Sequence, residues 1–171
     1  MAKDRYILDA STLIDIWFRF PKALKVFDPL WEQIEELVTT GTLVVTKRNF
    51  EEVKHKGEEI HDHFKSLGIK ILIPTQQILQ HALNIQEKLG ITDAEIKNNR
   101  REGVDEGDLL CIATAKHNGI ILVTEEKRQP VIAGNKGPTF TKYKIPRVCA
   151  MDSVNVECIN FLELLDLIKD L

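Results

Sequence analysis

The chain has 171 residues, a length typical of one domain with a substantial core. Its 43% hydrophobic and 29% charged residues are ordinary for a globular protein. The net charge of −3 gives no overall sign of nucleic-acid binding, although a local basic surface stays open. No apolar run is long enough to span a bilayer and no signal-peptide core is present, so we expect a cytoplasmic protein without a membrane anchor.

Strand and helix signals alternate along the first half of the chain. We expect strands at 5–9, 43–46 and 69–73. The third is a continuous apolar run between Gly68 and Pro74, which predicts a strand buried on both faces. Ser11 and Thr12 can cap a first helix, and further helices are expected at 30–38, 48–55, 58–67 and 76–89.

The same alternation continues in the second half. Residues 92–101 are polar and read as a short helix or a loop, and 125–143 read as a long loop. Helices are expected at 108–118, 145–151 and 161–171, and strands at 120–124 and 156–159. Such alternation predicts βαβ units. We therefore expect one α/β domain over 1–171, with three α/β/α layers and a mainly parallel sheet of four to five strands.

Four acidic residues stand where a predicted strand ends or a helix begins. Asp9 follows the first strand, Glu52 lies just beyond the second, Asp108 opens a helix, and Glu126 follows the fourth strand. The carboxyl ends of parallel strands face one crevice, so these side chains are expected to meet there. Two carboxylates about 4 Å apart repel by roughly 4 kcal/mol at an effective dielectric near 20. The cluster is therefore either partly protonated or holds a divalent cation.

Carboxylates and water are the ligands that Mg²⁺ or Mn²⁺ prefers, and such an ion can activate water for attack on phosphorus. Zinc fits less well because no histidine or cysteine lies at ligand spacing. The plainer alternative is that Asp9 and Asp108 serve helix N-termini and that the glutamates face water. The chain has no phosphate-binding glycine loop and no dinucleotide fingerprint.

Basic residues flank the acidic positions in sequence. Lys47 and Arg48 precede Glu52, and Lys127 and Arg128 follow Glu126. The plain interpretation is that these four basic residues are ordinary solvent-exposed side chains. The functional interpretation is a rim that holds a nucleic-acid backbone on either side of the metal.

Six short segments, in this order, resemble the PIN domain, a metal-dependent nuclease fold of bacterial toxins and RNA-processing enzymes. The last two resemble the PIN-like subgroup DUF4411. The segments are 6–14, 50–53, 107–115, 121–126, 144–149 and 158–165. The resemblance implies that the metal-binding and catalytic acids are Asp9, Glu52, Asp108 and Glu126. It also implies supporting positions at Ser11, Thr124, Asp105 and Glu125, the last being an alternative to Glu126 as the fourth acid.

The resemblance further implies a metal-dependent endoribonuclease that uses Mg²⁺ or Mn²⁺ on an RNA substrate. A toxin role with a neutralising antitoxin protein, and a homodimer, follow from the same resemblance. Two other classes stay open: a DNA or flap-type nuclease, and a non-catalytic RNA-binding or scaffold module. The presence of all four acids favours a nuclease over the non-catalytic module.

Overall fold

The computed structural model describes residues 5–98, 100–129, 137 and 139–169. Five strands form one sheet in the order β3-β2-β1-β4-β5, and all neighbouring strands are parallel. The strands are β1 (Tyr6–Leu8), β2 (Leu43–Thr46), β3 (Lys70–Leu72), β4 (Ile121–Val123) and β5 (Cys158–Ile159). The expected mainly parallel sheet is therefore present.

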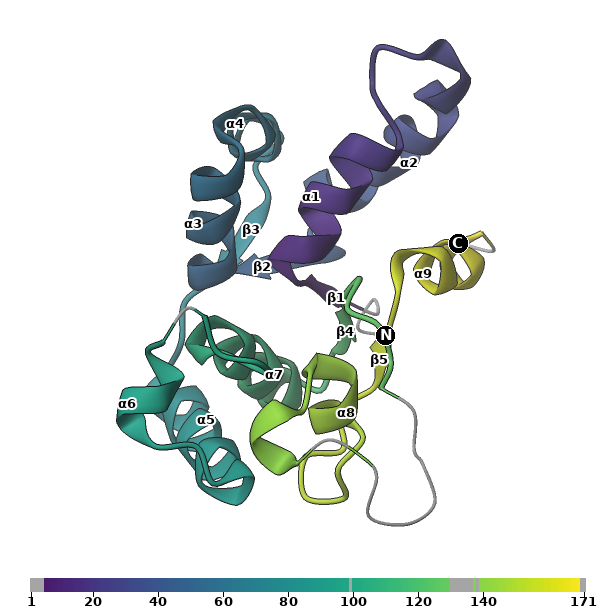
Figure 1. Cartoon of the computed structure of the whole chain (residues 1–171). Helices are drawn as coiled ribbons and strands as arrows, with labels where there is room; N and C mark the ends of the chain where they lie inside the picture. The colour runs from purple at the N-terminus through teal and green to yellow at the C-terminus, as the bar shows by residue number, and fades with distance from the viewer. Residues whose placement is uncertain (1–4, 99, 130–136, 138, 170–171) are drawn as a thin grey trace.

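Helices cover both faces of this sheet (Figure 1). One side carries α1 (Ala10–Arg19), α2 (Asp28–Thr39), α3 (Lys47–Lys56), α4 (Glu58–Ser66) and α9 (Phe161–Ile168). The other side carries α5 (Gln76–Leu89), α6 (Asp93–Ile96), α7 (Glu106–Asn118) and α8 (Ile145–Cys149). Short 3₁₀ turns are η1 (Lys25–Phe27) and η2 (Phe140–Lys142).

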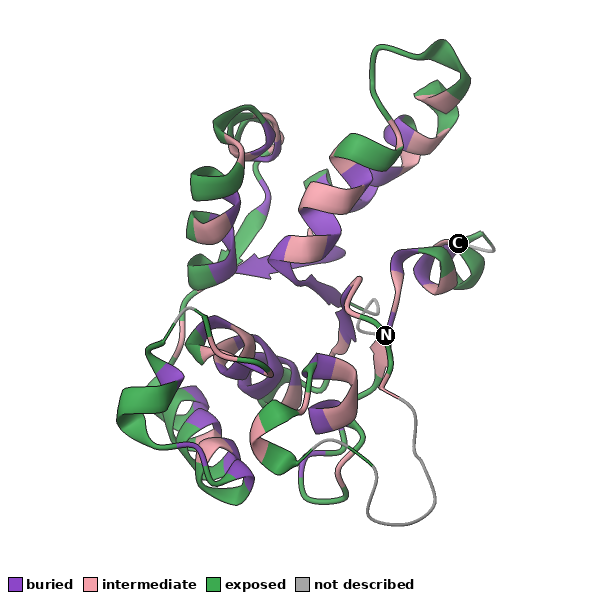
Figure 2. Cartoon of the chain, in the orientation of Figure 1, coloured by how far each residue is buried: buried purple, intermediate pink, exposed green. Residues whose placement is uncertain are grey.

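Alternate residues of the central strands divide the core into two halves. In β1, Tyr6 and Leu8 pack with the first group of helices, whereas Ile7 packs with the second. The β4 residues Val123 and Leu122 divide in the same way. Figure 2 shows the central strands buried and the helices exposed on their outer surfaces. Central strands of a parallel sheet are apolar on both faces for this reason.

The expectation that 69–73 is a strand buried on both faces is wrong. β3 forms at Lys70–Leu72, but it is the edge strand of the sheet, and Lys70 and Ile71 are exposed. An apolar run shows that a segment suits a strand and does not show its place in the sheet. The order of strands decides that burial, and it is set by contacts distant in sequence.

Two other expectations shift in detail. α7 begins at Glu106, two residues before the expected start, because the side chain of Asp105 accepts the backbone N–H of Asp108 and caps the helix. The predicted loop 125–143 contains η2, and its residues 130–136 and 138 lie outside the described part of the chain. Residues 170–171 of the expected closing helix also lie outside it. Within the described helices, none is long and apolar enough to cross a bilayer.

The pairing register aligns the carboxyl ends of the three central strands. Leu8 of β1 pairs with Val45 of β2 and with Val123 of β4. The residues that follow each strand therefore emerge side by side along one edge of the sheet. The N-terminus of α7 lies at the same edge, since the helix runs back antiparallel to β4, which it precedes.

Candidate active site

Asp9 is the first residue after β1 and is only 4% exposed. Its backbone N–H donates to the carbonyl of Val123 at the end of β4, 2.9 Å away, which joins the two strand ends. Asp9 stands at the N-cap position of α1, but its side chain accepts no capping hydrogen bond from that helix. A buried aspartate that does not cap its own helix needs another explanation for its position.

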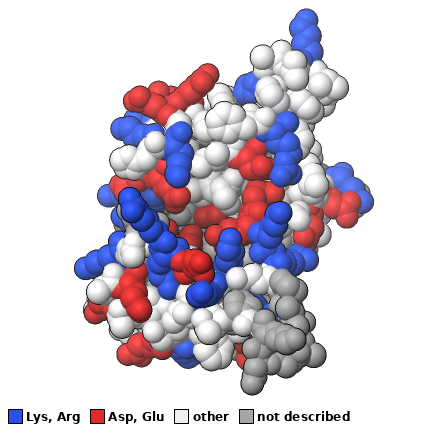
Figure 3. Space-filling view, viewed as in Figure 1, with Lys and Arg blue, Asp and Glu red and all other residues white. Residues whose placement is uncertain are grey.

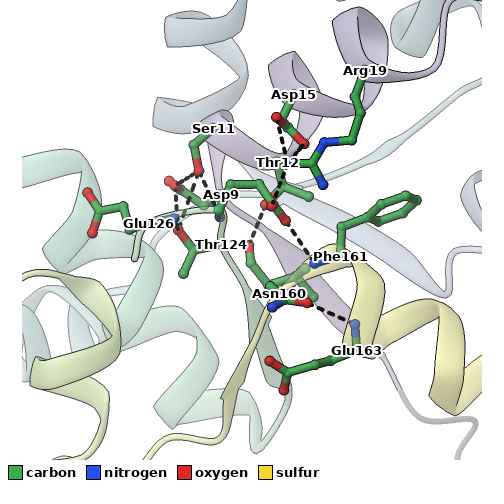
Figure 4. A network of polar contacts seen from close by, with 12 residues as sticks. Asp9, Ser11, Thr12, Asp15, Arg19, Thr124, Glu126, Asn160, Phe161 and Glu163 are labelled. Carbon is green, nitrogen blue, oxygen red and sulfur yellow. Dashed lines mark hydrogen bonds and ion pairs between the residues drawn. The ribbon is translucent and has the colours of Figure 1, made fainter. Parts of the chain in front are cut away.

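Two hydroxyl groups hold the Asp9 carboxylate in place (Figure 4). Ser11 Oγ donates to Asp9 Oδ2 at 2.6 Å, and Thr124 Oγ1 donates to the same oxygen at 3.0 Å. These donors come from α1 and from the end of β4, so the contact joins segments more than a hundred residues apart in sequence. The hydrogen bonds oppose the effect of burial, which raises the pKa of Asp9 above its ordinary value.

Asp108 occupies the first turn of α7 and takes part in a reciprocal capping pair. Its N–H donates to Asp105 Oδ1, and its own Oδ2 accepts the N–H of Asp105, both at 2.9 Å. The plainer interpretation of Asp108 as a helix-terminal residue is thus partly right. Among the described residues, no hydrogen bond reaches its other carboxylate oxygen, so that oxygen is available to a ligand.

The two adjacent glutamates after β4 point to different neighbours. Glu126 Oε2 accepts the N–H of Ile145 at 2.8 Å, at the start of α8. Glu125 Oε1 accepts the N–H of Phe161 at 2.8 Å, at the start of α9, and its other oxygen lies 3.6 Å from Arg19. In Figure 4, Glu126 lies on the opposite side of Asp9 from Arg19 and Phe161.

Electrostatic coupling separates these two glutamates further. The negative charge of Asp9 raises the pKa of Glu126 in addition to burial, the main cause. For Glu125, burial is again the main cause of the raised pKa, and the charges that act on it are those of Asp15, Arg19 and Glu163. Glu126 therefore belongs to the electrostatic group around Asp9, whereas Glu125 belongs to a contact between α1 and α9.

Glu52 reaches the group from α3. Burial raises its pKa, and the negative charges of Asp9 and Asp105 raise it further. Lys56 and Arg48 on the same helix act in the opposite direction. Glu52 and Asp105 also line one hollow of about 390 Å³ together with Arg48. Glu51, the residue before Glu52, is exposed to solvent.

Three neighbouring carboxylates act on Asp108. Burial is the largest cause that raises its pKa well above the ordinary value. The negative charges of Asp9, Asp105 and Glu126 raise it further. Carboxylates from four separate segments therefore lie close enough to disfavour each other's ionisation. Such a group is stable at neutral pH only if it keeps protons or gains a counter-charge.

The carboxylate oxygens of this group are suitable ligands for a hard divalent cation that keeps part of its hydration shell. In the described part of the chain, no group of three or more Asp, Glu, His or Cys side chains is arranged to hold a metal ion directly. Magnesium does not need such a cage, because proteins usually bind it through one or two carboxylates while it keeps several waters. Asp9 and Asp108 supply two carboxylates, the ligands that magnesium or manganese prefers. The Cys111 thiol also lies near them, but burial raises its pKa well above the ordinary value, which disfavours the thiolate that zinc would need.

Figure 3 shows Lys and Arg side chains interspersed with Asp and Glu side chains on this face of the molecule. Lys47 and Arg48 are exposed at the start of α3, and Lys127 and Arg128 are exposed after β4. Arg128 also forms an ion pair with Glu163 at 2.9 Å, so part of its charge is already matched. The acidic centre thus has cationic side chains on both sides.

Asn49 is a further polar residue at this site that the sequence did not single out. It is fully buried at the start of α3, its N–H donates to Thr46 Oγ1, and its side-chain amide interacts with the Cys111 thiol and lowers the pKa of that thiol. A Cβ on Gly107 would lie 3.7 Å from Asn49 Oδ1 and 3.4 Å from Asp105 Oδ1, so the amide lies close to the start of α7. Sequence alone gives no signal for it, because one asparagine before an acidic pair is common.

The chain matches one family model and is similar in fold to several solved structures. A family model described as "Domain of unknown function (DUF4411)" matches residues 6–169. The crystal structure of PAE2754 from Pyrobaculum aerophilum is similar, with a TM-score of 0.57 at 14% identity, and the match covers 98% of each chain. The crystal structure of VapBC2 from Rickettsia felis, bound to a DNA fragment from their promoter, has a TM-score of 0.54 at 13% identity over 91% of this chain and 98% of that one. No curated protein matches the chain.

At these identities, the likeness to solved structures establishes the fold alone. The expected PIN-like α/β architecture is confirmed by this likeness and by the parallel five-stranded sheet.

Proposed function

The chain belongs to the DUF4411 family, and on that premise we propose that it is a divalent-metal-dependent ribonuclease. The observation that carries the proposal is the meeting of Asp9, Asp108, Glu126 and Glu52 at the carboxyl edge of a parallel sheet, each with its pKa raised. This edge is where open α/β sheets bind ligands. A PIN-like fold with acids at this edge supports nuclease chemistry over a scaffold role.

The four acids have distinct parts in the proposal. Asp9 and Asp108 would bind the ion directly, with Asp9 oriented by Ser11 and Thr124. Glu126 and Glu52 would hold water molecules beside it. When bound, Mg²⁺ or Mn²⁺ would lower the pKa of a water molecule and offset charge on the phosphate oxygens.

In the proposal, the basic residues on both sides of the acidic centre position the RNA substrate. Lys47 and Arg48 on one side, and Lys127 and Arg128 on the other, are exposed and can contact phosphates of a strand that crosses the acidic centre. Contacts of this kind fix the position of the strand without reading its sequence. The proposal thus explains why an acidic centre that would repel RNA lies between cationic residues.

A toxin role with an antitoxin partner is a further part of the proposal. One protein of similar fold is VapBC2, whose crystal structure includes promoter DNA. Exposed apolar side chains at the end of α1 and in the following turn offer a surface that a protein partner can cover: Phe18, Leu24 and Val26. A homodimer rests on the family resemblance alone.

Cleavage assays with matched substrates test the proposed activity. We expect the purified protein to cut single-stranded RNA in Mn²⁺ or Mg²⁺, and EDTA to stop the reaction. Duplex and branched DNA of matched sequence serve as the comparison. Faster cleavage of branched DNA would support a flap-type nuclease instead, and RNA binding without any cleavage in Mn²⁺ would support the non-catalytic module.

The two glutamates after β4 provide a matched pair of variants. Glu126→Gln is expected to lower the rate of RNA cleavage by roughly 10–100-fold, the usual cost of altering residues around a metal's ligands. Glu125→Gln is expected to leave the rate nearly unchanged, because Glu125 contacts α9 and Arg19. Initial rates at saturating Mn²⁺ provide the comparison. Similar losses in both variants would show that the fourth acid is misassigned.

A further inference from the structure

A second cavity lies beside the acidic centre, between the residues after β4 and the segment from η2 to α8. Its volume is about 550 Å³, within the roughly 300–1,000 Å³ typical of small-ligand sites. Two aromatic rings and two arginines contribute to its lining, namely Phe140, Tyr143, Arg128 and Arg147. The aromatic and cationic side chains come from different segments and meet in one hollow.

A smaller hollow of about 300 Å³ lies next to this cavity. Thr124 and Glu126 contribute to its lining, and it shares Arg128, Pro146 and Cys158 with the larger cavity. Glu126 also bonds to the N–H of Ile145, the residue before Pro146. The residues around Glu126 are therefore continuous with one wall of the aromatic cavity.

The aromatic wall has the geometry of a stacking site. Phe140 and Tyr143 pack edge to face with their ring centres 5.3 Å apart, and the Arg147 guanidinium lies 5.0 Å from the centre of the Tyr143 ring. Phe140 is 57% exposed, so its ring is open to a ligand. Arg147 Nη1 is buried and has no hydrogen-bond partner among the described residues. Arg147 therefore places a guanidinium charge beside the aromatic wall.

The segment that carries the rings is fixed from one side by Gln129. Its Nε2 donates to the carbonyl of Lys142 at 3.1 Å, and its Oε1 accepts the N–H of Lys144 at 2.9 Å. One side-chain amide thus satisfies two backbone groups on either side of Tyr143. The ring platform is in this way attached to the chain that follows Glu126.

The other side of the segment is fixed by the turn before α7. Val104 N–H donates to the carbonyl of Tyr143 at 2.9 Å, and Arg101 Nη2 donates to the carbonyl of Thr141 at 2.7 Å. Gly103 has a φ of +89°, and a Cβ there would lie 2.6 Å from Thr141 O. Only glycine allows this approach. The platform is therefore held in place before any ligand binds.

We propose that this cavity binds a base of single-stranded RNA, next to the nucleotide whose phosphate lies at the acidic centre. The proposal rests on the ribonuclease function proposed above. The base stacks on Phe140, and the Arg147 guanidinium supplies positive charge beside the base and its phosphate. The cavity then sets which unpaired nucleotide lies beside the cut.

Binding without cleavage tests the cavity independently of the nuclease activity. A short fluorescein-labelled single-stranded RNA is titrated with the protein in EDTA, and anisotropy gives Kd. Phe140→Ala is expected to weaken binding about tenfold, a typical loss for one stacked base. Its matched control is Phe18→Ala, which removes another exposed ring, on α1. Arg147→Met, which keeps the apolar stem, is compared with Arg5→Met at the amino end of β1.

A single abasic position, moved along a cleavable RNA, locates the bound base. In the wild type, we expect weaker binding when the abasic position is one nucleotide from the cleavage site. That loss should disappear in Phe140→Ala, since the ring is then already missing. Unchanged Kd in Phe140→Ala and Arg147→Met, or an equal loss in the controls, would overturn the proposal. RNA binding that depends on these residues in a protein without nuclease activity would uphold the cavity and refute only the proposed function.

Discussion

Asp9→Asn and Asp108→Asn are each expected to lower Mn²⁺-dependent RNA cleavage by about a hundredfold or more. The reason is that each carboxylate contributes charge to a site where a metal supplies several kcal/mol of transition-state stabilisation, and about 1.4 kcal/mol corresponds to a factor of ten. Asparagine retains an oxygen that can accept from Ser11 and Thr124, so the loss does not come from a lost hydrogen bond. Initial rates of RNA cleavage measure the effect.

Asp166→Asn is the matched control for these two variants, because Asp166 lies exposed on α9 and forms an ion pair with the exposed Lys169. It should cut RNA at the wild-type rate. All four proteins are purified identically. Equal cleavage by Asp9→Asn, Asp108→Asn and the wild type would reveal a contaminating nuclease and defeat the assignment of the site.

The same Asp108→Asn change is expected to raise the melting temperature of the metal-free protein at neutral pH. It removes a charge that Asp9, Asp105 and Glu126 repel, while the asparagine oxygen can still accept the N–H of Asp105. For a protein of this size, each kcal/mol of relieved repulsion corresponds to roughly 2–4 °C. Calorimetry in EDTA measures the shift, with Asp166→Asn as the control.

The sign of the pH dependence follows from the raised pKa of Asp108. Between the ordinary aspartate pKa of 3.8 and the higher pKa in the folded protein, the folded state binds more protons than the unfolded state. Folding stability therefore falls as pH rises through this interval. The melting-temperature advantage of Asp108→Asn should be small near pH 4 and larger at pH 7. An advantage that shrinks as pH rises would contradict the repulsion inferred for this site.

The positions of the acids could be predicted from sequence because they depend on local order. Asp9 directly follows a strand, and Asp108 lies in the first turn of a helix. Parallel strands bring such positions to one edge without knowledge of side-chain contacts. The choice between Glu125 and Glu126 could not be made this way, because adjacent residues differ only in the neighbours that they meet. Those neighbours, Phe161 and Ile145, lie far along the chain.

The exposure of β3 and the aromatic cavity could not be predicted from the sequence, for a related reason. The exposure of β3 depends on its place at the edge of the sheet, and the same apolar run would suit a central strand. The aromatic cavity depends on Gln129 and Gly103, which hold η2 through backbone contacts. In sequence, both residues look like ordinary members of polar segments. Local patterns thus indicated the elements and where the acidic residues lie relative to them, whereas long-range packing decided burial and the second cavity.

Direct titration of metal tests the central claim, which is that these distant carboxylates share one divalent ion. Mn²⁺ binding to the wild type, Asp9→Asn and Asp108→Asn is measured by calorimetry or by the electron paramagnetic resonance signal of free Mn²⁺, without RNA. We predict saturable binding by the wild type, weakened at least roughly tenfold in each variant. No binding by the wild type, or equal affinity in all three proteins, would contradict the account.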